Sequence, residues 1–400
     1  MQKLWHTFAI LQFIGIWRPV HWLPGWKTKL YHCYTWFVII LVVTITISEL
    51  IELVSSFGDV ATLADNSFIL LTFIGDCSKA ANILKKRSKI IELTKVLQQD
   101  SFRPSSEKEF AIQLGSWYYY LRYLLLINFI HGCIIVTCSI VISSIATYQY
   151  NTIFTNKNSV YPTLPYSSWL PFDYYGSILG YSLAYSQQIG AVMAGAAVTT
   201  AFDSLVPALM LQTCAQLNIL KCRFHDMSQI INGQGRHTGR GDEFNLFITD
   251  LEKKLLANSS NTIFLQNSND LFGLVVFVQY TISTLVLCLS VFKLSTMKLF
   301  GAEFVACFIY IICVAVQIFN YCYYGSNVFI FQSLAVGDAV YEADWASFSI
   351  NAKRSLLTVM ARVLRPIKFT SGHVIILNLD YFNSLLKLSY SAYNVLQQSS

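Results

Sequence analysis

The residues best placed to carry ions lie in the last apolar stretch of the chain, residues 365–396. This stretch is long and apolar enough to span a bilayer, yet Asp380 and Lys387 lie well inside it. A charge near the centre of a bilayer costs about 2.5–3.5 kcal/mol on insertion scales, so such residues usually face protein or water. The stretch also carries hydrogen-bonding groups that lipid cannot satisfy, namely Ser384, Ser389, Tyr390, Ser391, Tyr393 and Asn394. This composition predicts a pore-lining helix, which the rest of the chain must hold and trigger.

The order of short motifs in this stretch resembles the C-terminal signature of insect odorant receptors. The family form is roughly P-x-x-x-T-A-G, a Phe, and then L-K-x-S-Y-S-Y-F-x-V-L. The chain carries Pro366, Thr370-Ser371-Gly372, Phe382, Leu386 to Ser391, and Val395-Leu396 in the same order. Ser371 replaces the usual Ala, and residues 392–394 replace the commoner Tyr-Phe-Thr. The resemblance is specific over about the last hundred residues and architectural over the rest.

The resemblance implies an all-α membrane protein with seven transmembrane helices, a cytosolic N-terminus and an extracellular C-terminus. Members of the family form cation channels that the last helix gates near its extracellular end. Carried over to this chain, the pore and gate residues are Tyr390, Asn394, Val395 and Gln398. Val395 is the candidate constriction, because a ring of apolar side chains can close a pore by excluding water. The alternative is that Val395 faces lipid near a helix end. We expect Lys387 to pair with a carboxylate at a subunit contact.

Composition independently indicates a helical membrane protein. Of the residues, 54% are hydrophobic and only 12% are charged, against about 25% charged in soluble domains. The net charge of +6 is not concentrated in one basic domain, which excludes a nucleic-acid-binding module. The ten cysteines show no CxxC pairing, so we expect no disulfide framework, no metal site and no cofactor. His131 and His373 are isolated and no G-x-S-x-G occurs, which argues against an enzyme.

The hydrophobic runs divide the chain into seven predicted spans. The first six cover residues 31–48, 57–84, 123–153, 174–202, 271–292 and 304–325, and the pore-like stretch is the seventh. The fourth run continues past Pro207 toward Leu220, too long for one crossing. Asp76 and Lys79 are close enough on the second run to pair. The expected divisions are a cytosolic segment 1–30, helices 1–4 in 31–210, a cytosolic extension and loop 211–270, helices 5 and 6 in 271–325, a cytosolic assembly region 326–366 and the pore helix 367–400.

The distribution of Lys and Arg predicts the orientation. Twenty-three of them lie on the side of the N-terminus, whereas Lys157, Lys293 and Lys298 lie on the opposite side. Cytosolic loops carry the excess of positive charge in membrane proteins. This rule therefore predicts a cytosolic N-terminus and an extracellular C-terminus, which is the reverse of the orientation of G-protein-coupled receptors.

A ligand site is expected in the outer halves of spans two, three, four and six, as the resemblance implies. Those half-spans are rich in aromatic residues and poor in polar ones, which suits a small, mostly apolar molecule oriented by one or two hydrogen bonds. For each residue, ordinary core packing is the alternative. The candidates are Phe68, Thr72, Phe73, Thr137, Cys138, Ile142, Tyr174, Ile178, Tyr181, Tyr185, Cys307, Phe308 and Ile311.

An assembly surface is expected in residues 341–365, which are too apolar for a solvated helix. Its candidate contacts are Tyr341, Trp345, Leu356 and Met360. In the family that the chain resembles, odorant-tuned subunits assemble with a shared olfactory co-receptor subunit (Orco) in a heterotetramer. The chain looks like a tuned subunit, because it lacks the long insertion before span five that marks the co-receptor type.

The leading hypothesis is therefore a subunit of an odorant-gated, non-selective cation channel in the plasma membrane of a sensory neuron dendrite. Its partners would be a small volatile odorant, the co-receptor subunit, membrane lipid and the permeating cations, with no nucleic acid. A gustatory-type chemoreceptor channel of the same fold is one alternative, although its terminal Gln-Phe is absent here. A membrane transporter is another, and it should show repeat symmetry.

Overall fold

The chain folds into long helices in a computed structural model. The structure describes residues 5–55, 60–96, 103–130, 132–134, 136–137, 164–166, 168–172, 174, 177–233, 241–296, 301–324, 329–342, 350, 353–354, 357, 360–361, 370–371, 375–376 and 378–399. The only strands in these residues are β1 (Thr370–Ser371) and β2 (Ile375–Ile376), which pair antiparallel. The all-α fold class is confirmed. The helices are α1 (Trp5–Phe13), α2 (Trp26–Ser55), α3 (Val60–Lys85), α4 (Arg87–Val96), α5 (Glu107–Tyr119), the π-helical turn η3 (Tyr120–Leu125), α7 (Ile178–Gly233), α8 (Gly241–Thr296), α9 (Ala302–Cys322), α10 (Phe329–Glu342) and α12 (Leu379–Ser399).

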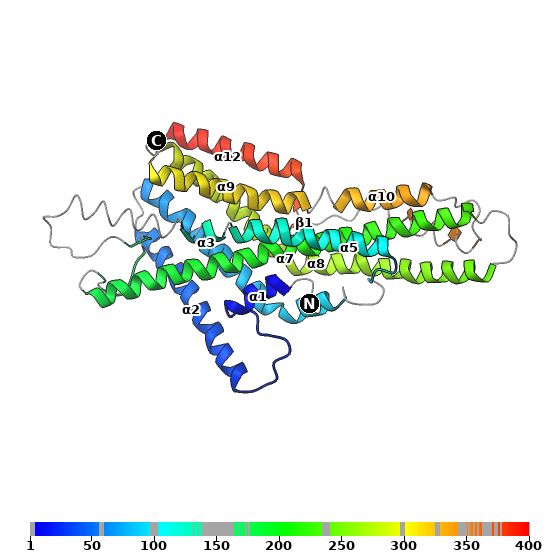
Figure 1. Ribbon diagram of the computed structural model, residues 1–400. Helices are drawn as coiled ribbons and strands as arrows, with labels where there is room; N and C mark the ends of the chain where they lie inside the picture. Colours follow the sequence, from blue (N-terminus) through cyan, green and yellow to red (C-terminus); the bar gives the residue numbers. More distant parts are fainter. Residues whose placement is uncertain are drawn as a thin grey trace.

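The two longest helices, α7 and α8, form the axis of the molecule (Figure 1). Each has 56 residues, which corresponds to about 84 Å at 1.5 Å per residue, whereas a bilayer core is about 30 Å thick. Helix α7 continues through Pro207 and ends at Gly233. Helices α5 and α10 lie along α7 toward one end of the molecule, and α12 lies beside α9, in contact with α8 and α9, away from that end (Figure 1). Helices α7 and α8 are therefore long enough to cross a bilayer and to extend well beyond it.

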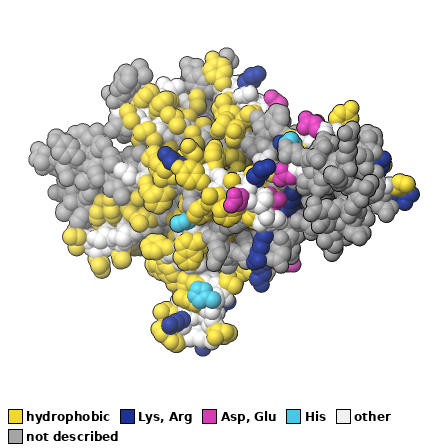
Figure 2. Space-filling model, turned by 45° about the vertical axis from the view of Figure 1, so that its right-hand side comes forward, with side chains coloured by type: hydrophobic (Ala, Val, Ile, Leu, Met, Phe, Trp, Pro, Cys, Tyr) yellow, Lys and Arg dark blue, Asp and Glu magenta, His cyan; other side chains and the backbone are white. Residues whose placement is uncertain are grey.

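Five helices in the described residues are long and apolar enough to cross a membrane. They are Trp26–Ser55, Asn66–Lys85, Ile178–Asp226, Asn267–Ser295 and Phe304–Cys322, and they overlap the first, second, fourth, fifth and sixth predicted spans. The third predicted span is described only up to residue 137, and the seventh contains α12, which is more polar. Figure 2 shows the corresponding surface, on which hydrophobic side chains cover broad areas and the visible Asp and Glu side chains gather toward one side.

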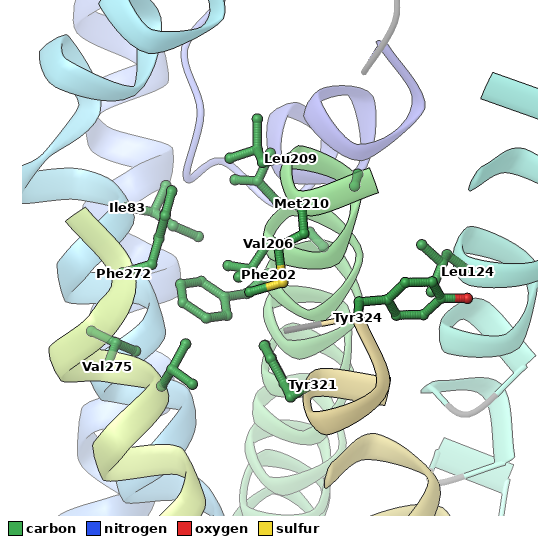
Figure 3. Close-up of a cluster of buried hydrophobic side chains, with 14 of the residues drawn as sticks. Ile83, Leu124, Phe202, Val206, Leu209, Met210, Phe272, Val275, Tyr321 and Tyr324 are labelled. Atoms are coloured by element: carbon green, nitrogen blue, oxygen red, sulfur yellow. The ribbon is translucent and has the colours of Figure 1, made fainter. Parts of the chain in front are cut away.

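The core is centred on α7, whose buried side chains meet those of α3, α8 and α9 (Figure 3). Phe202 of α7 and Phe272 of α8 are both fully buried and pack edge to face at 5.8 Å between ring centroids. Small residues on α7 let neighbouring helices approach closely, and Ala191, Ala201 and Ala208 are all buried. Helix α7 thus fixes the relative positions of the helices around it.

A charged clamp joins α5 to the extension of α7. Ser106 caps the start of α5, since its Oγ accepts from the backbone N–H of Glu109 at 3.2 Å, and the Glu109 carboxylate accepts from Ser105 N at 2.8 Å. The same carboxylate accepts two hydrogen bonds from Arg223, Nε to Oε1 and Nη2 to Oε2, both 2.8 Å. Bidentate pairs of this kind fix orientation as well as distance, so the clamp orients α5 on α7.

Candidate functional site

An aromatic and hydroxyl-bearing site lies between α3 and α9. Phe68 and Thr72 lie four residues apart on α3 and therefore share one face of the helix. Thr72 Oγ1 lies 2.7 Å from the hydroxyl of Tyr310 on α9, and the rings of Phe68 and Tyr310 are 5.7 Å apart. All three side chains are half-buried. We call Phe68, Thr72, Cys307, Tyr310 and Ile311 the Thr72–Tyr310 site.

The edge of this site is set by α8. Cys307, one turn before Tyr310, donates its thiol to the carbonyl of Ser290 at 3.6 Å. The ammonium of Lys293 lies over the face of Phe68, 4.9 Å from the ring centroid, an arrangement that favours the cation electrostatically. The site is therefore a mostly apolar contact between helices, with two hydroxyls and with one cation on the ring of Phe68.

The other predicted ligand residues lie in several places. Phe73 is buried and packs edge to face on Tyr166 at 6.4 Å. Tyr181 and Tyr185 stack on each other at 6.1 Å along α7. Ile178 and Phe308 are exposed, and Tyr174 is half-buried. Thr137 is also exposed, and its hydroxyl donates to the carbonyl of Cys133. Cys138 and Ile142 lie outside the described residues.

Sequence reasoning missed Tyr310, Lys293 and Tyr166. Tyr310 lies three residues after Cys307, so it falls on the same face of α9 and could have been included by that spacing. Lys293 and Tyr166 come from segments that no periodicity links to α3, so their places beside Phe68 and Phe73 required the tertiary fold.

A buried ion pair lies deeper in the bundle than the Thr72–Tyr310 site. Lys79 of α3 lies 3.0 Å from Asp203 of α7, and the two side chains are 1% and 4% exposed. The carboxylate of Asp203 also accepts hydrogen bonds from Tyr321 at 2.7 Å and from Gln317, both on α9. The sequence suggested that Lys79 would pair with Asp76 on its own helix. It forms its salt bridge across helices instead, because the side chain of Lys79 points into the contact with α7.

Asp76 adds a second carboxylate to this cluster. Thr199 donates to Asp76 Oδ1, and Lys79 Nζ donates to Thr199 Oγ1 at 3.3 Å. A side chain at Gly195 of α7 would not fit, because a Cβ there would meet Asp76 Oδ2. Asp76 follows Thr72 by one helical turn on α3. The cluster of Asp76, Lys79 and Asp203 therefore lies next to the Thr72–Tyr310 site along α3.

Pro207 interrupts the backbone hydrogen bonding of α7 next to Asp203. Proline has no N–H, so the carbonyl of the residue four positions earlier, Asp203, loses its helical partner. The buried amide of Asn128 donates to that carbonyl at 3.2 Å and to Ser204 Oγ at 3.3 Å. Thr200 in turn donates to the carbonyl of Asn128 at 3.1 Å. A neighbouring helical segment thus completes the backbone hydrogen bonding of α7.

Helix α12 packs one narrow face on the bundle. Leu385 and Ser389, four residues apart, are buried, and Phe382 contacts Phe319 of α9 edge to face at 5.6 Å. The hydroxyl of Tyr280 on α8 donates to the carbonyl of Tyr381 at 3.3 Å. The pore candidate is therefore held by both α8 and α9.

The opposite face of α12 is uncovered in the single chain. Asp380, Ser384, Lys387 and Ser391 are exposed, and Tyr390 is 64% exposed. Asn394 is half-buried; Val395 and Gln398 lie in the last two turns of α12, with side chains outside the described set. A polar face on a helix beside apolar spans requires either water or another protein surface.

The predicted assembly residues fall only in part on the described chain. Tyr341, near the end of α10, is 72% exposed, and Leu357 is 65% exposed. Met360 is half-buried and packs against the core. Trp345 and Leu356 lie outside the described residues.

Comparison with known proteins gives one consistent result. The family model described as "7tm Odorant receptor" matches residues 59–390. Odorant receptor 10 of Aedes albopictus is 24% identical over 93% of this chain and 94% of its own length, and Odorant receptor Or1 of Anopheles gambiae is 20% identical over 99% and 95%.

Among solved structures, the insect olfactory receptor OR5 of Machilis hrabei superposes with a TM-score of 0.81 at 15% identity, covering 100% of this chain and 98% of that one. Its structure in complex with eugenol superposes with a TM-score of 0.80. Because the relatives are receptors, the prediction that the chain is not an enzyme is confirmed. The match to the family model over most of the chain, the similar receptors and the shared fold show that this protein belongs to the insect odorant receptor family.

Proposed function

We propose that the chain is the odorant-tuned subunit of a ligand-gated, non-selective cation channel in the plasma membrane, assembled with the olfactory co-receptor (Orco). The coarser statements are established by family and fold, namely that it is an odorant receptor and a multi-pass membrane protein. The proposal adds the ligand site, the gate, the partner and the current.

The Thr72–Tyr310 site supports binding of a small odorant. The related OR5 has been solved with eugenol, and the site here offers aromatic surface from Phe68 together with two hydroxyls. A ligand of about ten heavy atoms at a Kd of about 1 μM requires about 8.2 kcal/mol. That is about 0.8 kcal/mol per atom, below the ceiling of about 1.5 for small ligands, so no charged anchor is needed.

One observation carries the link to gating, which is that α9 touches both the ligand site and the pore helix. Tyr310 contacts Thr72, and Phe319 on the same helix packs on Phe382 of α12. Phe319 follows Tyr310 by nine positions, which correspond to about 13.5 Å of helix. A ligand that favours a different position of α9 would therefore shift α12 with it, to the extent that its affinity differs between the two states.

The uncovered surfaces support an oligomer. The exposed polar face of α12, with Asp380, Lys387 and Tyr390, needs water on one side and a partner helix on the other. The exposed apolar residues Tyr341 and Leu357 extend the uncovered surface toward the cytosolic region. Several subunits around a central axis would satisfy both surfaces, with the gate at Val395 lining that axis.

The experiment is a recording of membrane current in cells that lack insect receptors. The chain is expressed alone and with the co-receptor, a panel of volatile organic compounds is applied, and G-protein signalling is blocked. Fast cation current in the paired cells only is the expected result. Current that disappears with the block would contradict the channel proposal, because the signal would then be metabotropic.

A second recording tests the gate. Val395→Ala in the paired channel should raise the current in the absence of odorant, because a smaller side chain weakens the apolar constriction. Leu386→Ala removes the same kind of side chain from an exposed position nine residues earlier, on the opposite face of α12, and should leave the resting current unchanged. Equal leak in both variants would remove Val395 from the gate.

A further inference from the structure

The protons of the Thr72–Tyr310 pair are both committed within the protein. Thr72 Oγ1 donates to the carbonyl of Phe68 at 2.8 Å, one helical turn back. A threonine hydroxyl has a single proton, so Thr72 has none left for Tyr310. The 2.7 Å contact between the two hydroxyls therefore requires that Tyr310 donates and Thr72 accepts.

At the two hydroxyls, this count leaves only lone pairs for a ligand. In the described part of the chain, the Tyr310 hydroxyl has Thr72 as its one hydrogen-bond partner, so its oxygen can still accept. Of the other donors beside the pair, the Cys307 thiol donates to the carbonyl of Ser290, and the Lys293 ammonium lies over the ring of Phe68. A ligand group that meets Tyr310 must bring its own proton, because two acceptors facing each other form no hydrogen bond.

The surroundings restrict the charge of that group. The ammonium of Lys293 lies on the face of Phe68, whose ring is the neighbour of the Tyr310 ring. A cationic amine in the site would be repelled by Lys293, and an ionised carboxylate has only acceptors to offer Tyr310. A neutral hydroxyl on an apolar skeleton satisfies both restrictions.

We infer that this site selects volatile alcohols and phenols over ethers, aldehydes and esters of similar size, with the ligand hydroxyl donating to Tyr310. This inference rests on the proposed function, because it places the odorant in the Thr72–Tyr310 site. One neutral hydrogen bond contributes about 0.5–1.5 kcal/mol. An alcohol or phenol should therefore be up to about tenfold more potent than its ether isomer.

The experiment uses isomers that differ in their polar group. Benzyl alcohol and 4-methylphenol are compared with anisole, and 1-heptanol with hexyl methyl ether, by dose–response currents of the chain paired with the co-receptor. Binding of the same isomers is measured by thermal stabilisation of the purified complex. Lower half-maximal concentrations for the hydroxyl members are expected. Equal or greater potency of the ethers, or no binding of any hydroxyl member, would overturn the inference.

Variants at Thr72 test the proton count itself. Thr72→Val removes the acceptor of the Tyr310 proton and so turns Tyr310 into a donor, which should improve the ethers up to about tenfold toward the alcohols. Thr72→Ser keeps the hydroxyl and should keep the wild-type preference. Lys293→Met is a further control, since it should leave the ratio of alcohol to ether potency unchanged. An unchanged ether potency in a folded Thr72→Val receptor would contradict the assigned direction of the hydrogen bond.

Tyr310→Phe completes the set. It removes the acceptor oxygen and should weaken the alcohols without improving the ethers. The two readouts separate this inference from the channel proposal. Odorant currents evoked by ethers or esters alone would refute the hydroxyl preference and leave the channel proposal intact. Selective binding of alcohols without any current would refute the channel proposal and leave the hydroxyl preference intact.

Discussion

Removing the ammonium of Lys79 should destabilise this receptor more than removing the carboxylate of its partner. The pair is buried, with Lys79 1% and Asp203 4% exposed and 3.0 Å between Nζ and Oδ1. Lys79→Met leaves two carboxylates, those of Asp76 and Asp203, in one buried cluster without a cation. Asp203→Asn leaves the ammonium with Thr199 and with the electrostatic attraction of Asp76.

The geometry sets the magnitude. Coulomb's law gives about 5.5 kcal/mol for unit charges at the observed 3.0 Å and an effective dielectric constant of 20. Breaking a buried pair from one side typically costs about 3–5 kcal/mol, because a buried charge is left without compensation. We expect Lys79→Met to cost about that much, and Asp203→Asn about 1–3 kcal/mol, since it leaves hydrogen-bond donors less well paired. The double variant should recover part of the loss.

The assay is the fraction of fluorescently tagged receptor that still elutes as a single species from a size-exclusion column after heating. Lys108→Met is the control, because Lys108 is 68% exposed and its pair with Asp226 lies at the surface, where such pairs contribute about 0–1 kcal/mol. If Lys79→Met were no more harmful than Asp203→Asn, or if the double variant lost the full sum of both, the assignment of two buried carboxylates to one cation would be wrong.

Three further predictions concern helix contacts. Gly195→Ala should destabilise the folded receptor by about 1–3 kcal/mol, because its Cβ would collide with the carboxylate of Asp76 on α3. Gly115→Ala is the control in the same heating assay and should be neutral or stabilising, because a Cβ at Gly115 meets nothing within 4 Å. Arg223→Lys should lose the two-point contact with Glu109 and cost about 1–2 kcal/mol, measured as the coupling in a double-mutant cycle with Glu109→Gln. Phe319→Ala should lower the maximal odorant current while leaving ligand binding to the purified complex within about twofold, because it removes an α9–α12 contact away from the ligand site.

Each of these predictions has a result that would contradict it. A Gly195→Ala receptor as stable as wild type would mean that α3 and α7 can separate at no cost. A coupling near zero between positions 109 and 223 would reduce the clamp to an ordinary surface pair. Loss of ligand binding in Phe319→Ala would place Phe319 in the support of the ligand site instead of in the link to α12.

What the sequence could predict depended on whether a feature was local. The all-α class and five of the spans followed from apolar runs, and the polar last helix followed from charges inside such a run. Thr72 and Cys307 were identified as candidates because they are polar groups in aromatic half-spans. The partner of Thr72, Tyr310, was missed, although its spacing from Cys307 places it on the same face of α9.

The partner of Lys79 shows the same limit. Spacing along one helix suggests Asp76, three residues away, whereas Asp203 is more than a hundred residues away and is brought close only by the α3–α7 contact. Cross-helix pairs of this kind leave no periodic signal in a single sequence. The side chains of Val395 and Gln398 lie outside the described set, so their gate roles stay predictions.

The substitution of a side-chain amide for a missing backbone N–H has a consequence for how this family can change over time. Pro207 and Asn128 form one unit, since the amide is useful where proline has freed the carbonyl of Asp203. A receptor that acquires another residue at position 207 regains the helical donor, and the buried amide at 128 then loses its main acceptor. The two positions are therefore expected to vary together among related receptors, with proline at one accompanied by a hydrogen-bond donor at the other.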